Sequence, residues 1–252
     1  MNVLDSTASI GSSIKRYTKF ITSSGLERLL LYELNKITKN LNVISGGKSH
    51  ISALCTVNEI WTILLNSRIC KEIWIHVRDP FVLKHQKNLF MQLNSSDWGL
   101  FIPFSSELPK PYTKVISSNS VVKNTMLIQS IVRDVIKGHC HRSVQLQGDH
   151  LPKVLEKHGY TPIPPKVMIT LENNLCKVLV NASGDLSERP WHKFSSIPDR
   201  LESNAAAAIS YEIFKTYNYN EIKEFTIWDP FCHNGSLLME LYSILSGTFR
   251  VI

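Results

Sequence analysis

The residues best able to do chemistry lie near the C-terminal end, in the stretch 227–238 with the sequence IWDPFCHNGSLL. An apolar run, the turn-forming segment Asp229–Cys232, the small residues Gly235 and Ser236, and a second apolar run predict a strand, a turn and the start of a helix. Small side chains at such a turn let ligand atoms reach backbone amides, and a helix N-terminus favours negative charge. The stretch therefore predicts a site for a nucleotide-like cofactor, and a purely structural strand-turn-helix is the alternative.

Composition describes the kind of protein that carries this stretch. With 252 residues, 43% of them hydrophobic and 19% charged, the chain can form one large domain or two small ones. No apolar run approaches the roughly 18 residues of a transmembrane helix, so we expect no membrane partner. Five cysteines, without CxxC spacing, favour a reducing compartment, cytoplasmic or nuclear. Residues 1–18 lack a secretory signal and predict a flexible leader, with organellar import as the alternative because they are rich in serine and threonine.

The net charge of +7 is unevenly distributed along the chain. Residues 1–194 hold 24 lysines and arginines against 14 acidic residues, whereas residues 195–252 hold 4 against 7. A basic part followed by a mildly acidic end fits a polyanion-binding module joined to a different kind of domain. An ordinary basic surface is the alternative explanation.

The first elements predicted by periodicity form a familiar order. Apolar spacing and turn residues predict strands and helices in the order β-α-β-β-α-β, which is the split βαβ or ferredoxin-like pattern. The predicted elements are a strand at 19–21, a helix at 26–34, a strand at 41–44, a turn at Gly46-Gly47, a strand at 50–54, a helix at 57–67 and a strand at 69–78.

The remaining chain predicts a second group of helices and strands and then the loop described above. A helix at 119–138 is expected to stop at Gly138, since glycine is a common helix terminator. The other expected elements are a helix near 84–93, a strand at 113–117, an exposed insertion at 138–165, strands at 166–171 and 176–182, a helix at 200–217 and a strand at 226–228.

Motifs found in the same order along the chain resemble the THUMP-domain RNA methyltransferases, from about Phe20 to the C-terminus. Residues 24–30 (SGLERLL) are similar to the family's A-x-G-L-E-x-L-L, and the helix from Lys123 to Ile136 is similar to its N-T…K-D-A-I helix. A strand ending in Ser183-Gly184 precedes Arg189 in the place of the family's L-x-x-R, and residues 201–209 (LESNAAAAI) look like its alanine-rich helix. The Asp229–Cys232 segment looks like the family's D-P-M/F-C-G-S/T-G-T cofactor loop.

The resemblance implies an α/β protein and S-adenosylmethionine-dependent methylation of a guanine in ribosomal or transfer RNA. It implies a leader at 1–18, a ferredoxin-like lobe at 19–78, a THUMP-like RNA-binding module at 79–186, a linker at 187–199 and the start of a Rossmann-like methyltransferase domain at 200–252. The implied cofactor residues are Asp229, Pro230, Phe231, Cys232, Gly235 and Ser236. The implied contacts to structured RNA are Lys123, Asn124, Arg133, Lys137 and Arg189, and a solvated helix face is the alternative for those on the 119–138 helix.

Three departures from the family pattern change the expected activity. His233 and Asn234 replace small residues of the loop, nothing resembles the catalytic N/D-P-P-Y/F segment, and the second strand of the cofactor domain would lie beyond Ile252. An imidazole in this loop is expected to crowd a cofactor or force a different turn, whereas asparagine tolerates a positive φ. We therefore assign no catalytic residue and expect a chain that is incomplete by truncation and does not methylate by itself.

Two other interpretations of the function stay open. A non-catalytic RNA-binding protein with a decayed cofactor loop is the first, and a DNA adenine methylase, which shares the Asp-Pro-Phe-Cys style of loop, is the weaker second. A histidine-rich stretch with His139, His141, His150 and His158 beside Cys140 matches no zinc spacing, so we expect no metal.

Overall fold

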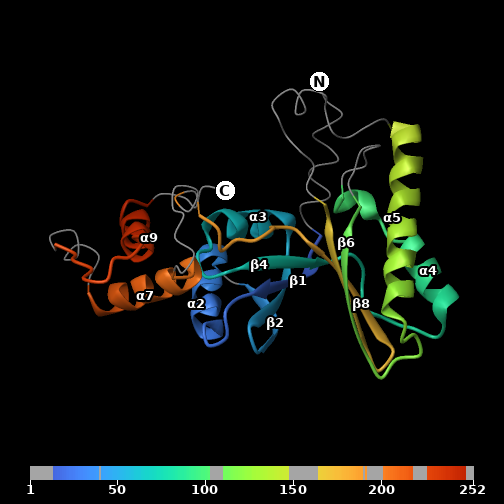
Figure 1. Cartoon of the computed structure of the whole chain (residues 1–252), viewed down its shortest axis with the longest axis horizontal. Helices are drawn as coiled ribbons and strands as arrows, with labels where there is room; N and C mark the ends of the chain where they lie inside the picture. Colours follow the sequence, from blue (N-terminus) through green and yellow to red (C-terminus); the bar gives the residue numbers. More distant parts are fainter. Residues whose placement is uncertain are drawn as a thin grey trace. The chain divides into compact units, whose positions relative to one another are not determined.

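The computed structural model describes residues 14–39, 41–102, 110–147, 164–189, 191, 201–217 and 226–247 (Figure 1). The chain divides into two compact units. The first unit combines Met1–Trp74 with Ser183–Ile252, and the second is Ile75–Ala182. The mixture of helices with strands confirms the predicted α/β class.

The N-terminal part of the first unit has the predicted β-α-β-β-α-β order. Its sheet runs β2-β3-β1-β4, and β3 pairs antiparallel with both β1 and β2, so the βαβ unit is split by an inserted strand. The elements are β1 (Arg16–Ile21), α2 (Glu27–Thr38), β2 (Asn42–Gly47), β3 (His50–Cys55), α3 (Val57–Asn66) and β4 (Glu72–His76).

Local sequence explains these elements. Alternation in β3 buries Ile51, Ala53 and Cys55 on one face. Helix α3 starts at a capping box, in which Thr56 and Glu59 satisfy each other's backbone amides.

The predicted turn at Gly46-Gly47 is wrong by two residues. Both glycines belong to β2, and the reversal occurs at Lys48-Ser49. Ser49 takes a positive φ of 63° there, and its amide donates to the Glu27 carboxylate at 2.7 Å. This contact with helix α2 stabilises the turn. The periodicity of the sequence cannot predict it, because Glu27 and Ser49 are 22 residues apart.

Two C-terminal helices complete the first unit, α7 (Ser203–Thr216) and α9 (Ser236–Leu245), which pack against each other (Figure 1). The strand predicted at 226–228 is wrong, because these residues adopt no regular structure. Ile227 and Trp228 are 40% and 82% exposed. A strand needs a neighbour for its backbone hydrogen bonds, and no other strand pairs with these residues in the part of the chain that the structure describes.

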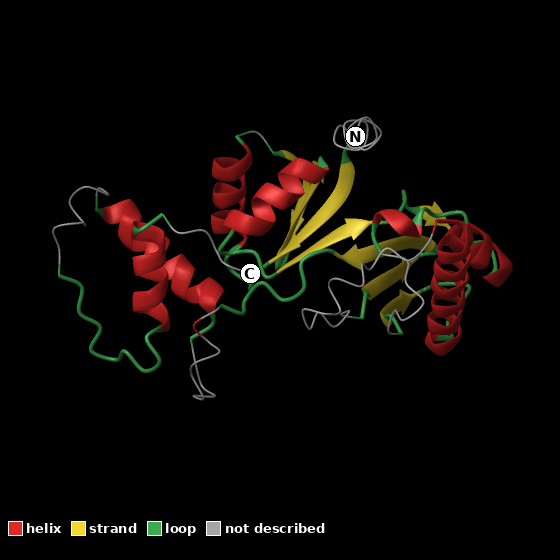
Figure 2. Cartoon of the chain, turned by 90° about the horizontal axis from the view of Figure 1, so that it is seen from above, coloured by secondary structure: helices red, strands yellow, loops and turns green. Residues whose placement is uncertain are grey.

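The second unit is a sheet covered by helices on one face. Its strands run β6-β7-β8, with β6 parallel to β7, β7 antiparallel to β8, and β5 paired with β8. Helix α5 lies along one side of these strands (Figure 2). The elements are β5 (Phe81–Val82), α4 (Gln86–Asn94), a 3-10 turn at Trp98–Leu100, β6 (Tyr112–Ser118), α5 (Thr125–Gln147), β7 (Lys166–Glu172) and β8 (Leu175–Asn181).

Helix α5 corrects the expectation that Gly138 ends it and that an irregular insertion begins there. The helix runs on to Gln147. Ile136, Cys140 and Val144 continue its apolar stripe at steps of four residues, and all three pack into the core of the second unit. A mid-helix glycine costs only about 1 kcal/mol, so this packing carries the helix through it. The rest of the predicted insertion, and most of the predicted linker at 187–199, lies outside the described residues.

No helix among the described residues is long and apolar enough to cross a membrane.

Candidate functional site

The predicted cofactor residues lie together in one loop at the start of α9. The Asp229 carboxylate accepts a hydrogen bond from the Phe231 amide at 3.0 Å, and the Gly235 amide donates to the Cys232 carbonyl at 2.6 Å. The Asn234 side-chain oxygen accepts from both the amide and the hydroxyl of Ser236. These bonds make a folded turn that brings the chain into the helix.

Two residues of this loop occupy the left-handed region. Gly235 has φ 74°, and a Cβ added there would meet only the Cys232 sulfur, at 4.0 Å. His233 has φ 48°, whereas Asn234, the residue expected to tolerate a positive φ, does not take one. A left-handed conformation costs a non-glycine residue roughly 1–2 kcal/mol. The backbone at 233 therefore keeps the shape that a glycine would take freely.

The loop fits a cofactor in part. Gly235 has no side chain to cap α9, so the first-turn amides of that helix receive no side-chain hydrogen bond from the capping position. Ser236 is buried, but Phe231 is 89% exposed, and Pro230 and Cys232 are exposed as well. Among the described residues, two pockets are lined by other parts of the chain and by no residue of this loop.

A buried ionic network holds α9 in the first unit. The Glu240 carboxylate lies 2.9 Å from Nη1 of Arg68 and 2.6 Å from Nε of Arg189, and its side chain is fully buried. Arg68 also donates to the Ser243 hydroxyl at 2.9 Å. The residues that hold the helix after the loop at 229–236 thus come from three distant parts of the sequence.

The structure corrects the assignment of Arg189 to RNA. Its side chain is fully buried, and besides Glu240 it donates to the carbonyls of Leu186 and Arg68. A guanidinium whose donors are used inside the protein cannot pair with a phosphate in this conformation. Arg189 is therefore a structural partner of Glu240.

A second buried carboxylate lies beside this network. Glu33 of α2 accepts hydrogen bonds from the Ser67 and Tyr211 hydroxyls and from the amides of Arg68 and Ile69. Burial raises the pKa of Glu33, and its four donors oppose that shift. Burial, followed by the nearby Glu33 charge, also raises the pKa of the Tyr211 hydroxyl. Glu33 connects α2, the segment before β4 and α7.

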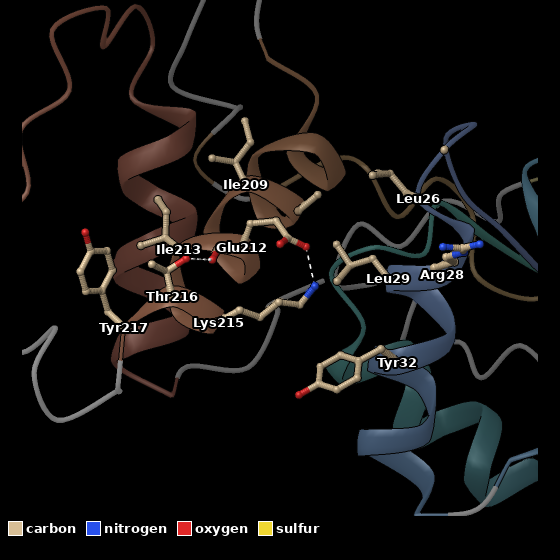
Figure 3. A pocket seen from close by; sticks show the side chains of 12 residues that line it. Leu26, Arg28, Leu29, Tyr32, Ile209, Glu212, Ile213, Lys215, Thr216 and Tyr217 are labelled. Carbon is tan, nitrogen blue, oxygen red and sulfur yellow. Dashed lines mark hydrogen bonds and ion pairs between the residues drawn. The ribbon is translucent and has the colours of Figure 1, made fainter.

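A groove of about 740 Å³ lies between α2 and α7 (Figure 3). Apolar side chains form much of its lining, and Lys215 forms an ion pair with Glu212 beside it. None of the predicted cofactor residues contributes to it. Residues of its wall include Leu26, Arg28, Tyr32, Ile209, Ile213 and Tyr217.

The other RNA candidates lie in the second unit and are exposed. Arg133 and Lys137 are one turn apart on α5, so they share its solvent face. Lys123 and Asn124 precede the helix, and the Asn124 side chain accepts from the Leu127 amide at 3.1 Å, as a helix cap does. These four residues are available to a polyanion.

The histidine-rich stretch gives no metal cluster among the described residues. His139, Cys140 and His141 are consecutive in α5, so their side chains point in different directions around the helix. Cys140 is buried in the core, and burial lowers the pKa of His139. His150 and His158 lie outside the described residues.

Comparison with known proteins gives likeness of fold and no match of sequence family. No protein-family model matches the chain, and no curated protein matches it. Solved structures that match include a predicted N6-adenine-specific DNA methylase from Listeria monocytogenes, at 15% identity and a TM-score of 0.64 over 95% of this chain and 57% of that one. SMU.472, assigned as a methyltransferase and complexed with SAH, matches at 18% identity and a TM-score of 0.61 over 94% and 58%.

TrmN from Thermus thermophilus matches at 15% identity and a TM-score of 0.62, over 91% of this chain and 62% of TrmN. The chain thus spans less than two thirds of the length of each of these structures. At these identities the likeness concerns the fold. The chain has the fold found in the corresponding part of solved methyltransferase structures.

Proposed function

We propose that this chain is the RNA-binding portion, with the start of the cofactor domain, of an S-adenosylmethionine-dependent RNA methyltransferase acting on guanine in ribosomal or transfer RNA. The observation that carries the proposal is the fold likeness over 91–95% of the chain to methyltransferase structures, one of them holding SAH. The family motifs in the sequence supply the finer assignment to THUMP-domain enzymes.

The charge of the second unit supports RNA as the partner. Its described residues include 11 lysines and arginines against 4 acidic residues. Lys123, Arg133 and Lys137 are exposed, as phosphate contacts must be. We assign these three residues and Asn124 to contact with structured RNA.

Two observations favour the DNA methylase hypothesis, the Asp-Pro-Phe-Cys style of the loop and the name of the Listeria structure. TrmN matches with a similar TM-score over a similar share of this chain, so the comparisons do not favour DNA over RNA as the substrate. A duplex DNA and an RNA hairpin of matched length therefore separate the two proposals directly. Preference for the hairpin supports the RNA assignment, and preference for the duplex DNA overturns it.

We expect the chain to bind an RNA hairpin with affinity that falls steeply as salt rises. Neutralised phosphates release counterions, so the logarithm of affinity falls linearly with the logarithm of salt concentration. Replacing both Arg133 and Lys137 with alanine removes two contacts, and should reduce the magnitude of the slope by about 1.8 for a duplex stem. Fluorescence anisotropy from about 50 to 200 mM salt measures both slopes.

The matched control for this measurement is Arg28→Ala with Lys36→Ala, which removes one arginine and one lysine, both exposed, from α2 in the first unit. The control should keep the slope of the unaltered chain. An affinity that stays flat over the same salt range would contradict an RNA-binding role.

For the cofactor, we expect titration calorimetry to detect no micromolar binding of S-adenosylmethionine to the unaltered chain, because Pro230, Phe231 and Cys232 are exposed and His233 replaces a small residue of the loop. His233→Gly removes the imidazole that is expected to crowd a cofactor, and should therefore tighten any millimolar binding. The strain of the positive φ is present without a ligand, so its relief should stabilise the fold by roughly 1–2 kcal/mol and leave the affinity unchanged. Asn234→Gly is the control, since it removes a side chain that binds the start of α9 and should not tighten binding. Micromolar binding by the unaltered chain would overturn this account of the loop.

A further inference from the structure

We propose that the open face of the second unit's sheet binds single-stranded RNA, with lysines contacting phosphates and Tyr112 stacking on a base. The inference rests on the proposed RNA-binding function and adds a second, separate surface to it. That face is defined by Tyr112, Lys114 and Ile116 of β6, Lys166, Met168 and Thr170 of β7, and Lys177 of β8. It is open along β6, whereas Leu179 of β8, which is paired with Met168, is buried.

Strand register places these side chains on one face. Tyr112 is paired with Lys166, Lys114 with Met168, and Ile116 with Thr170, which is in turn paired with Lys177. Paired residues point to the same side of a sheet, and successive residues alternate. The members of the open face therefore form a lattice in which cations alternate with apolar and aromatic groups.

The opposite face is the one that the helices cover. Val167, Ile169 and Leu171 of β7, which alternate with the open-face residues, are fully buried. They belong to the same core as Ile128, Val132 and other residues of α5. The helices thus occupy one side of the sheet, and the other side is exposed along β6, where Tyr112 is 63% and Ile116 is 43% exposed, and half-buried along β7.

The chemistry of the open face favours a nucleic acid strand over a protein. Lys114, Lys166 and Lys177 stand between the apolar groups, whereas Glu172, at the end of β7, is the one acidic residue that the described strands add to this face. Lysine is depleted in the cores of protein interfaces, and the apolar groups here are interrupted by charges. Aromatic and cationic side chains on a sheet bind single strands, because every base offers a face for stacking while the phosphates meet the cations.

The open face and the Arg133–Lys137 surface are distinct. Arg133 and Lys137 are exposed on a helix whose inner side packs on the covered face of the sheet. The two basic surfaces therefore lie on opposite sides of the second unit. A strand bound to one cannot replace a strand bound to the other, which makes the two surfaces separable by mutation.

The test compares two probes, a ten-nucleotide single-stranded RNA and an RNA hairpin with a blunt stem. Lys114→Ala with Lys177→Ala should weaken the single strand about tenfold and reduce the magnitude of its salt slope by about 1.4, while the hairpin changes less than about twofold. Tyr112→Leu should weaken the single strand about tenfold through lost stacking. Tyr32→Leu, which alters a tyrosine of similar exposure in the first unit, is the matched control and should change neither probe.

The outcomes separate the inference from the proposed function. If the hairpin binds with the expected salt dependence and the open-face variants leave the single strand unchanged, the inference is overturned and the proposed function stands. If neither RNA binds, both fail. Tighter binding of a single-stranded DNA of the same sequence would overturn RNA as the occupant of this face.

Discussion

Replacing Glu240 with alanine is expected to lower the free energy of unfolding by about 3–5 kcal/mol, because the variant leaves Arg68 and Arg189 buried without a counter-charge. Both ion pairs are inaccessible to solvent, with side-chain exposures of 7% or less for the three residues. Water therefore screens neither guanidinium when the carboxylate is removed. The free energy of unfolding of a typical domain is only about 5–15 kcal/mol, so this one change should unfold a large part of the first unit at moderate urea concentrations.

The control is an exposed ion pair of the same unit. Glu212 pairs with Lys215 on the surface of α7, and at least half of each side chain is exposed. Glu212→Ala should cost less than about 1 kcal/mol, as surface pairs do. Urea unfolding followed by circular dichroism measures both variants, and a loss below about 1 kcal/mol for Glu240→Ala would contradict the buried network.

A triple replacement tests whether the buried charges are needed for the stability of the fold. Replacing Arg68, Arg189 and Glu240 together with apolar residues of similar volume is often neutral or stabilising at such sites. Recovery of stability in this variant would show that the charges are not required for the stability of the first unit. The network joins the α3–β4 connection, the segment after Ser183 and α9, so it connects the helix that follows the loop at 229–236 to the ferredoxin-like lobe.

The parts of the fold that can be predicted from the sequence are those set by local periodicity. The alternation of β3 and the apolar stripe of α2 follow from neighbouring residues, and the predicted β-α-β-β-α-β order is therefore correct. The predicted end of α5 is wrong, because Gly138 is overridden by Cys140 and Val144 packing into a core formed with distant strands. The strand predicted at 226–228 is wrong because strand formation depends on a partner, which no local pattern supplies.

The candidate site, too, could be predicted from the sequence only in part. The loop at 229–236 can be found from its residue types, and its folded turn exists. The sequence misassigns Arg189 because it does not show whether an arginine side chain is buried or exposed. Its partner Glu240 is 51 residues away, and Arg68 lies 172 residues from Glu240. The open sheet face is also missed, although the alternation of Tyr112, Lys114 and Ile116 with residues of the other face is a signal that could reveal it.

Replacing Glu33 with glutamine is expected to lower the free energy of unfolding by about 1–3 kcal/mol, since one buried backbone amide loses its acceptor. Each carboxylate oxygen accepts from one backbone amide, Arg68 on one side and Ile69 on the other. Whichever way the glutamine amide is turned, its NH₂ group faces a donor. A protonated carboxyl avoids this conflict because its hydroxyl can donate to Ser67 or Tyr211, whose own hydroxyl groups can rotate.

The cost of Glu33→Gln should shrink as pH rises. Burial raises the pKa of Glu33 above its ordinary value of 4.5, so the folded state holds the proton more tightly than the unfolded chain does. The stability that this proton provides is fully present below pH 4.5 and is lost as pH rises through the raised pKa of the folded state. The gap in unfolding free energy between the unaltered chain and Glu33→Gln is therefore largest in acid.

Glu27 provides a comparison in which stability should change with pH in the opposite direction. Backbone amides, that of Ser49 foremost, lower the pKa of Glu27, so its contribution is present above pH 4.5 and is lost as pH falls. Urea unfolding should be measured for the unaltered chain, Glu33→Gln and Glu27→Gln from acid to neutral pH. The difference in unfolding free energy between the unaltered chain and each variant should shrink with rising pH for Glu33→Gln and grow for Glu27→Gln. A Glu33→Gln gap that widens with rising pH would mean that the four donors outweigh burial and that Glu33 is held as an ionised carboxylate inside the first unit.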